Sequence, residues 1–283
     1  MKYLGSKERL ANHIIPIITQ DKEKYDLYIE PFCGSLAVIE KVTDIPKFAS
    51  DINPYLIAMW KGINWGLNLD APMEIPKSLY DEYRNKFNLL KKAPQSIIEY
   101  TINNVQYYDV DIRQLVTDDW EVTFRELFLI GWIGFMASFN GRFYDGGYSG
   151  KTDKRDYVDE QIRNTLKQIP KIMSIDTLEV NDYRQLFNRI GCKEIYNDFA
   201  KYKGNYLIYC DIPYKNSKKY AFDTNFDYDI FYDWCRLLSK RGHKIFISEY
   251  EMPDDFKCVW EMEVTNSMHP TKTKKPIEKL FTL

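Results

Sequence analysis

The sequence predicts an α/β fold with a doubly wound, mostly parallel sheet and a smaller helical region inserted into it. Short apolar strand patterns alternate with helical patterns over residues 26–65 and again over 174–283. This alternation is typical of parallel sheets with helices on both faces. Between these stretches, helical patterns predominate and no comparable strand is evident. We therefore expect residues 1–66 and 172–283 to form the sheet-containing part and residues 67–171 to form the insertion.

The first part of the sheet follows from the order of its apolar segments. Residues 6–20 place apolar side chains on one helical face, and Pro16 is expected to kink or end this helix. The next elements are expected to be a strand at 26–30, a turn at 31–35, a helix at 36–42, a strand at 46–51 and a helix from 54 to about 65.

The remaining elements follow from the same patterns. Helices are expected at 77–91, 95–108 and 119–137, followed by a loop rich in glycine and aromatic residues at 138–157. Strands are then expected at 174–180, 205–210, 244–250, 258–264 and 278–283, with helices at 183–190 and 226–240. Buried strands such as NYLIYC (205–210) are continuously apolar, as in sheets covered on both faces.

Composition excludes several classes of protein. The 283 residues include 39 Lys and Arg against 41 Asp and Glu, a net charge of −2, in an ordinary globular mixture that is 45% hydrophobic and 28% charged. No apolar run is long enough to span a membrane, and the first residues lack the apolar core of a secretory signal. The five cysteines form no CxxC pair and the three histidines are scattered. We expect a cytoplasmic protein with reduced cysteines, no metal site and no membrane partner.

A nucleotide-sized pocket is expected where the first strand ends. Residues 30–35 (EPFCGS) join this strand to the next helix, and Gly34 would let a ligand approach the backbone closely. Asp51 ends the following strand, about 20 residues after Glu30, from where a carboxylate can reach a pair of ribose hydroxyls. The turn lacks GxGxxG, which disfavours a dinucleotide pyrophosphate. Taken alone, the same residues fit an ordinary turn with a capping acid better than a nucleotide site.

A second polar turn follows the most apolar strand. Asp211, Ile212, Pro213 and Tyr214 lie directly after NYLIYC, where the ligands of open parallel sheets bind. The alternative is structural: Asp211 caps a turn, Pro213 stiffens it, and Tyr214 packs sideways.

Taken together and in order, these motifs resemble those of the adenine-N6 DNA methyltransferases of the Dam type. Residues 3–7 (YLGSK) resemble the opening cofactor motif of that family, and 30–35 resemble its cofactor turn. Residues 51–53 (DIN) resemble its acidic motif, and 211–214 (DIPY) resemble its Asp-Pro-Pro-Tyr. The resemblance covers nearly the whole chain.

The resemblance implies a Rossmann-like class I methyltransferase that binds S-adenosylmethionine. Residues 1–66 and 172–283 would form the catalytic domain that binds the cofactor, and residues 67–171 would form the domain that recognises the DNA target. The residues that this resemblance assigns to the cofactor are Tyr3 and Lys7 at its methionine end, Gly34 beneath it, Asp51 at the ribose, Asp182 and Tyr183 at the adenine edge, and Glu30, Phe32 and Asp211 around it.

The resemblance also implies a mechanism for the second turn. The Asp211 carboxylate and the Ile212 carbonyl would hold the two N6 hydrogens of an adenine flipped out of duplex DNA, and Tyr214 would stack on its ring. Ile212 stands where the family usually has proline; its carbonyl is retained, and Pro213 still restricts its backbone. Ser35 stands where many relatives have glycine. Cytosine-carbon methylation fits less well, because it needs a nucleophilic cysteine after proline and no Pro-Cys occurs.

The loop at 138–157 is expected to contact DNA, because it interleaves basic and aromatic residues in a glycine-rich backbone. The expected DNA contacts are Asn140, Arg142, Tyr144, Lys151 and Arg155 in this loop, and Tyr220 after the catalytic turn. A mobile surface loop with solvated charges remains the alternative. A second basic stretch at 272–275 could follow phosphates.

Three functions remain open at this point. The first is an adenine methyltransferase acting on double-stranded DNA as a monomer or weak dimer, a lone methylase of prokaryotic or phage origin. The second is a catalytically silent relative that binds DNA or regulates, to which only Ile212 points. The third is an amino methylase acting on RNA or protein.

Overall fold

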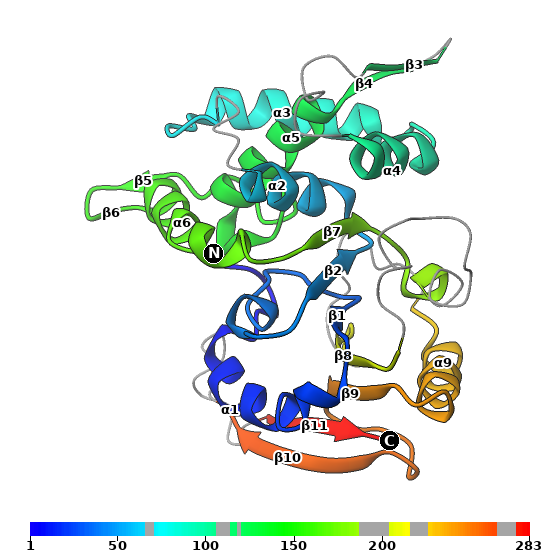
Figure 1. The fold of residues 1–283 in the computed structure, drawn as a ribbon. Coiled ribbons are helices and arrows are strands. Elements are labelled where there is room, and N and C mark those ends of the chain that lie inside the picture. Colours follow the sequence, from blue (N-terminus) through cyan, green and yellow to red (C-terminus); the bar gives the residue numbers. More distant parts are fainter. Residues whose placement is uncertain (66–70, 106–113, 118–119, 187–203, 216–225, 265–275) are drawn as a thin grey trace.

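A computed structural model describes residues 1–65, 71–105, 114–117, 120–186, 204–215, 226–264 and 276–283 (Figure 1). Its centre is a seven-stranded sheet in the order β10-β11-β9-β8-β1-β2-β7. The strands are β1 (Leu27–Glu30), β2 (Lys47–Asp51), β7 (Thr177–Val180), β8 (Tyr206–Asp211), β9 (Lys244–Glu249), β10 (Lys257–Glu263) and β11 (Ile277–Thr282). The expected α/β class is confirmed.

The sheet is mostly parallel, as the sequence predicted. Strands β7, β2, β1, β8 and β9 pair in parallel, whereas β11 is antiparallel to both β9 and β10. The chain proceeds outward from β1 through β2 and β7 on one side and through β8 and β9 on the other. The strand order therefore reverses between β1 and β8, the position where doubly wound sheets form a ligand crevice.

Helices cover both faces of this sheet (Figure 1). The longer ones are α1 (Glu8–Ile18), α2 (Pro54–Asn64), α3 (Lys77–Leu90), α4 (Gln95–Asn104), α5 (Phe124–Ala137), α6 (Tyr157–Leu166) and α9 (Tyr228–Lys240), and α7 (Ile169–Ile172) is a single turn. Side chains alternate along β1: Tyr28 joins the core beneath α1 and α2, whereas Leu27 and Ile29 join the core beneath α9. None of the helices in the described ranges is long and apolar enough to cross a membrane.

Local capping explains where several helices begin. The Asn53 side chain accepts hydrogen bonds from the backbone N–H groups of Tyr55 and Leu56, at 3.1 and 3.2 Å, and so starts α2 directly after β2. Asp227 caps α9 in the same way through Ile230. A capping side chain satisfies backbone donors that the helix itself leaves unpaired.

Several expected elements differ in the structure. The helix expected at 36–42 is reduced to a single 3₁₀ turn, η2 (Ile39–Lys41), because Leu36 has a left-handed backbone with φ of 59°. The helix expected at 119–137 begins only at Phe124; residues Trp120–Thr123 form β4, which pairs with β3 (Gln114–Thr117). The expected loop at 138–157 contains a hairpin of β5 (Lys151–Thr152) and β6 (Arg155–Asp156).

Other boundaries agree, differ by a few residues or fall outside the described residues. Pro16 lies inside α1 and does not end it, since the helix continues to Ile18. The helix expected at 95–108 ends earlier, at Asn104, because the backbone of Val105 is extended. The end of the helix expected at 183–190 lies outside the described residues.

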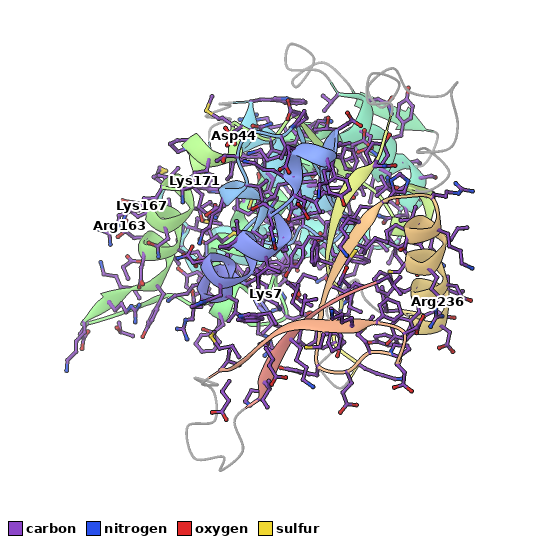
Figure 2. All side chains as sticks on the ribbon, turned by 60° about the horizontal axis from the view of Figure 1, so that its bottom comes forward. Lys7, Asp44, Arg163, Lys167, Lys171 and Arg236 are labelled. Carbon is purple, nitrogen blue, oxygen red and sulfur yellow. The ribbon has the colours of Figure 1, made fainter. Side chains whose placement is uncertain are left out.

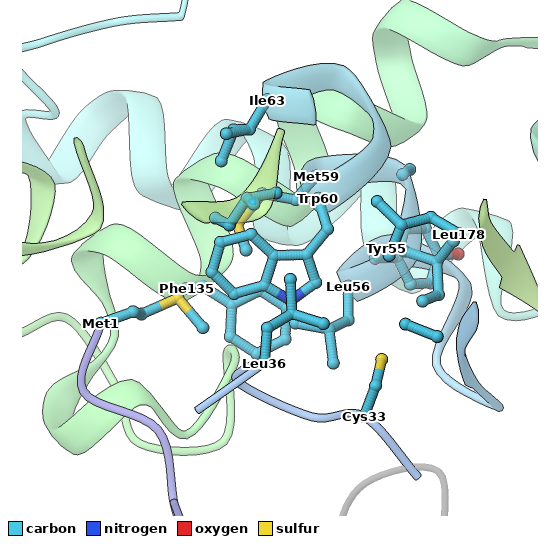
Figure 3. Packing of buried hydrophobic residues seen from close by; sticks show 14 of the residues in the cluster. Met1, Cys33, Leu36, Tyr55, Leu56, Met59, Trp60, Ile63, Phe135 and Leu178 are labelled. Atoms are coloured by element: carbon cyan, nitrogen blue, oxygen red, sulfur yellow. The ribbon is translucent and has the colours of Figure 1, made fainter. Parts of the chain in front are cut away.

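The helices of residues 67–171 pack directly on the sheet-containing part. One hydrophobic cluster continues from α2 into α5, and Trp60 lies among Leu36, Leu56 and Phe135 (Figure 3). The closest approach is at Gly131 of α5, where an added Cβ would clash with the carbonyl oxygen of Tyr55. The two parts therefore share a core, and α5 supports the helix that follows β2.

We expect Gly131→Ala to destabilise the protein, although alanine favours an exposed helix by about 1 kcal/mol over glycine. The added methyl group must displace the backbone of α2, and overpacking of this kind costs about 1–3 kcal/mol. The free energy of unfolding in urea measures the effect. Asn85→Ala, on an exposed face of α3, is the control and should change it by less than about 0.5 kcal/mol. Equal stability of the two variants would contradict the packing described.

Candidate active site

The polar turns expected from the sequence meet at one edge of the sheet. Strands β1 and β8 are parallel neighbours, with Ile29 opposite Ile208, so the turns that follow Glu30 and Asp211 emerge side by side. Asp51 ends β2, the next strand, opposite Val180 of β7. The carboxyl ends of these strands thus carry the polar residues of both motifs.

The turn after β1 is held in a close, strained arrangement around Gly34. Its φ is +44°, its N–H donates to Asp51 Oδ2 at 3.0 Å, and its carbonyl accepts from Trp60 Nε1 at 2.9 Å. The Tyr3 ring lies so near that a Cβ at this position would be 3.1 Å from it. Glycine is therefore required here by both conformation and space.

Asp51 shapes the same turn with both of its carboxylate oxygens. While Oδ2 accepts from Gly34, Oδ1 accepts from the backbone N–H of Asn53 at 3.0 Å. The carboxylate is thus fixed between the turn after β1 and the start of α2.

The first seven residues connect this turn to the turn after β8. Ser6 Oγ lies 2.9 Å from Ser35 Oγ, and Lys7 Nζ lies 2.9 Å from Asp211 Oδ1. The Lys7 side chain is only 8% exposed (Lys7 is labelled in Figure 2). A single short segment therefore touches both motifs and fixes them relative to each other.

Burial and ion pairing act in opposite directions on the pKa values at this pair. Burial raises the pKa of Asp211, and the Lys7 ammonium opposes this rise. Burial alone would lower the pKa of Lys7, but the carboxylates of Asp211 and Glu278 outweigh it and raise this pKa. Lys7 is accordingly a cation whose charge favours the anionic form of Asp211.

The rest of the turn after β8 is well packed. Ile212 is 2% exposed in the core beneath α9, and the carbonyl of Pro213 accepts a hydrogen bond from Tyr228 at 2.9 Å. Tyr214 is 9% exposed, and Lys7 Nζ lies 4.6 Å from the centre of its ring. The isoleucine that replaces the family's proline is thus held by apolar packing.

Glu30 is directed into the protein. Its side chain is 3% exposed and accepts a hydrogen bond from the Tyr28 hydroxyl at 2.7 Å. Burial raises the pKa of Glu30 well above its ordinary value, and the bond from Tyr28 offsets this only in part. A carboxyl buried in this way and bonded to Tyr28 suits support of the turn better than contact with a cationic ligand.

The residues after β7 divide into three environments. Asp182 accepts hydrogen bonds from the Arg184 backbone N–H and Nε, both at 2.9 Å. Tyr183 packs its ring against Phe32 and Trp234, with centroids 5.4 and 5.3 Å away. Asn181 is 2% exposed, and among the described residues neither its side-chain amide nitrogen nor its amide oxygen has a hydrogen-bond partner.

An unsatisfied buried amide is costly, so Asn181 is a feature that a ligand could relieve. It has one acceptor and two donors at the edge of the sheet where the β2 turn also lies, because its N–H donates to the Asp51 carbonyl. Asn181 is the first residue of the segment 181–183, which resembles the family's contact with the adenine edge of the cofactor.

Two further polar residues at this edge were missed by the sequence analysis. Glu278 of β11 accepts a hydrogen bond from the Tyr214 hydroxyl at 2.6 Å, and its Oε2 lies 3.9 Å from Lys7 Nζ. Glu249 ends β9 and is 2% exposed; its Oε2 has no hydrogen-bond partner, and burial raises its pKa to about 7. No sequence motif surrounds either residue. The parallel pairing of β8 with β9, with Asp211 opposite Ser248, brings Glu249 to this edge, and the antiparallel pairing of β11 with β9 brings Glu278 there.

The residues expected to contact DNA differ in how exposed they are. Asn140 is exposed, with a left-handed φ of 54°, and Arg142 is half-buried. Lys151 and Arg155 are exposed on the β5–β6 hairpin, where Lys151 lies 3.8 Å from Asp156 and Arg155 binds Glu160 with two hydrogen bonds. Tyr220 and the basic stretch 272–275 lie outside the described residues.

Tyr144 is a correction to the sequence analysis. It is 2% exposed, its hydroxyl donates to the Ile130 carbonyl at 3.1 Å, and its ring packs on Tyr80 and Phe87. The structure places Tyr144 in the core between α3 and α5, where its ring packs against the rings of Tyr80, Phe87 and Phe143.

The most regular row of basic residues lies on α6 and α7 (Figure 2). Arg163, Lys167 and Lys171 follow one another at four-residue spacing. Arg163 pairs with Asp159 at 2.7 Å, and Lys171 with Glu40 at 3.4 Å. These carboxylates offset part of the positive charge of the row. In the described ranges, no group of His, Cys, Asp and Glu could hold a metal ion.

Comparison with known proteins gives one match. The family model for D12 class N6 adenine-specific DNA methyltransferases matches residues 3–275. No curated protein matches the chain. The matched range contains every residue of the two turns described above.

Glu249 makes a testable contribution to the dependence of stability on pH. Its pKa rises from an ordinary value of 4.5 to about 7 on folding, so the folded protein binds the proton more tightly over that range. The free energy of unfolding should therefore decrease by up to about 3 kcal/mol as the pH rises from 4.5 to 7. Glu249→Gln removes this decrease and should stabilise the protein at pH 8.

Urea unfolding at several pH values measures this difference. Glu261→Gln is the control, because Glu261 is an exposed carboxyl on β10. A Glu249→Gln variant with the same pH slope as the wild type would show that Glu249 is not a buried carboxyl of raised pKa.

Proposed function

Because the chain belongs to the D12 class N6 adenine-specific DNA methyltransferases, we propose that residues 211–214 carry out its reaction on an adenine flipped out of duplex DNA. The enzyme transfers a methyl group from S-adenosylmethionine to the N6 nitrogen of adenine in DNA. The finer assignments below are our proposal. The contact of residues 3–7 with both turns carries it, since it brings a cofactor site and a carboxylate acceptor to one crevice.

The cofactor site is proposed at the turn after β1. We assign the ribose to Asp51 and the floor of the site to Gly34, next to the Tyr3 ring. The residues after β7, Asn181 and Asp182, are assigned to the adenine edge. The unsatisfied amide of Asn181 supports this fit, because adenine offers a donor and an acceptor side by side. When bound, S-adenosylmethionine supplies a methyl group activated by its sulfonium charge.

The other cofactor assignments are refined by the contacts of each residue. Phe32 and Tyr183 pack against each other and would form an apolar wall of the site. Glu30 is assigned a supporting role, because it bonds to Tyr28. Lys7 was expected at the methionine end; its ion pair with Asp211 favours a role in positioning that carboxylate.

The reacting nitrogen needs two hydrogen-bond acceptors. The N6 lone pair of adenine is delocalised into its ring, so holding both hydrogens draws the nitrogen toward a pyramidal, more nucleophilic geometry. We assign one hydrogen to Asp211 Oδ2, since Oδ1 faces Lys7, and the other to the Ile212 carbonyl. Tyr214 is assigned to stack on the base, a contact that is worth about 1–3 kcal/mol. Positioning and charge then carry the in-line transfer. The nitrogen would gain the methyl group as the bond between sulfur and the methyl carbon breaks, and Asp211 would accept the N6 proton that it holds.

Residues 67–171 are proposed to recognise the DNA target, with residues 1–66 and 172–283 as the catalytic domain. The β5–β6 hairpin projects from the side of α6 (Figure 1) and carries exposed Lys151 and Arg155. Asn140 and Arg142 are assigned to base edges, for which their side chains are well suited. A cytoplasmic monomer or weak dimer remains part of the proposal. A silent relative is not favoured, because the acceptor groups of the turn are retained despite Ile212.

Asp211→Asn should lower methyl transfer by at least about a hundredfold, as loss of a positioned proton acceptor does. The amide keeps the volume of the side chain, and Glu278 still faces Lys7, so the fold should be retained. Transfer of tritiated methyl groups to duplex DNA measures the effect, with digestion of the product to locate the label in deoxyadenosine. Asp229→Asn, an exposed carboxylate on α9, is the control. An active Asp211→Asn enzyme, or label outside deoxyadenosine in the wild type, would overturn the assignment.

Lys7→Met should move the acidic limb of the pH–rate profile to higher pH. The reaction needs anionic Asp211, so activity is lost as the pH falls through the pKa of this carboxyl in the enzyme. Removing the Lys7 ammonium leaves burial unopposed and raises this pKa further. Transfer rates measured between pH 5 and 9 at saturating cofactor test this shift. An unchanged acidic limb in an active variant would show that Lys7 does not control Asp211.

A further inference from the structure

We propose that Glu278, near the carboxyl end of the chain, is a positioning residue that fixes the Tyr214 ring for the incoming adenine. The proposal rests on the function assigned above to Tyr214. Glu278 belongs to none of the motifs from which the site was recognised. Its role follows from contacts that only the folded chain creates.

The hydrogen bond between Glu278 and Tyr214 is the first observation. Glu278 Oε2 accepts from the Tyr214 hydroxyl at 2.6 Å, and the Glu278 side chain is 13% exposed. Hydrogen bonds to an ionised acceptor are short and about twice as strong as bonds between neutral groups. Burial, together with the carboxylates of Asp211 and Glu278, raises the pKa of Tyr214 well above its ordinary value, so the hydroxyl remains a donor.

The ring is held from two further directions. Lys7 Nζ lies 4.6 Å from the centre of the Tyr214 ring, within the range of cation–π contacts. Tyr250 packs against Tyr214 at nearly a right angle, with centroids 4.6 Å apart and an interplanar angle of 81°. A ring fixed at its hydroxyl, by an ammonium over one face and by a neighbouring ring has lost its rotational freedom before the base arrives.

Glu278 also belongs to the charge network of the catalytic carboxylate. Its Oε2 lies 3.9 Å from Lys7 Nζ, which itself lies 2.9 Å from Asp211 Oδ1. One ammonium is therefore shared by two carboxylates that come from β8 and β11. The network links the acceptor for N6 to the ring that stacks on the base, and Glu278 is the group bonded to that ring.

A double-mutant cycle separates positioning from mere structural support. Glu278→Ala and Tyr214→Phe each remove one partner of the hydrogen bond, and each should lower kcat about tenfold. If the bond is the reason, the double variant should lose no more than the more affected single variant. Glu278→Gln keeps an acceptor oxygen and should recover part of the loss.

The readouts are kcat, the KM for S-adenosylmethionine and the melting temperature, each measured with purified full-length enzyme and unmethylated duplex DNA. A positioning role predicts a change in kcat with little change in the other two. Sequencing of the wild-type product first identifies the target adenine, and 2-aminopurine is then placed at that position. Its fluorescence should show less base flipping with Glu278→Ala than with the wild type. Glu261→Ala on β10 is the control for loss of an exposed carboxylate from the neighbouring strand.

The outcomes distinguish this proposal from the one it rests on. A wild type that transfers no methyl to DNA overturns both. If the wild type is active, two outcomes overturn only the role of Glu278. One is a double variant whose loss of kcat is the product of the two single losses. The other is a Glu278→Ala enzyme with normal kcat and normal base flipping. Should Glu278→Ala fail to fold, Glu278→Gln and Tyr214→Phe decide: normal kcat in both overturns the proposal, and lowered kcat in Tyr214→Phe with recovery in Glu278→Gln supports it.

Discussion

The ion pair between Lys7 and Asp211 joins the beginning of the chain to the turn proposed to carry the reaction. A buried pair of this kind gains little net stability, because desolvation offsets its attraction, but it is strongly directional once formed. Here the ammonium also faces Glu278 and the Tyr214 ring. Residues from three distant parts of the sequence are thus held around one charge, which favours the anionic form of Asp211.

The turn after β1, which is proposed to bind the cofactor, is held in place by packing that includes residues 67–171. Trp60 donates to the Gly34 carbonyl and packs in the cluster that contains α5. Tyr3 lies between Gly34 and Phe135 of α5, with the two rings 5.9 Å apart. The part of the chain proposed to recognise DNA therefore shares its core with the residues that shape the cofactor site.

The sequence analysis failed where a local pattern competed with a tertiary constraint. Residues 36–42 have an apolar helical pattern, but the left-handed backbone of Leu36 leaves only one turn. Tyr144 was grouped with a polar loop because of its glycine-rich neighbours, yet its ring completes the core between α3 and α5. Both errors arose at the ends of glycine-containing turns, where the chain direction is set by packing that no short window of sequence contains.

The sequence by itself determined the α/β class, the approximate strands and the two motif-bearing turns, because continuous apolar strands and their following polar turns are local features. The family was also recognised from the sequence, because four short motifs resemble those of its members in the same order: 3–7, 30–35, 51–53 and 211–214. Only the tertiary structure decided that Lys7 faces Asp211, that the Asn181 side chain is buried without a hydrogen-bond partner in the described part of the chain, and that Glu278 bonds to Tyr214. These contacts depend on strand order and on the antiparallel return of β11, which join residues far apart in the chain.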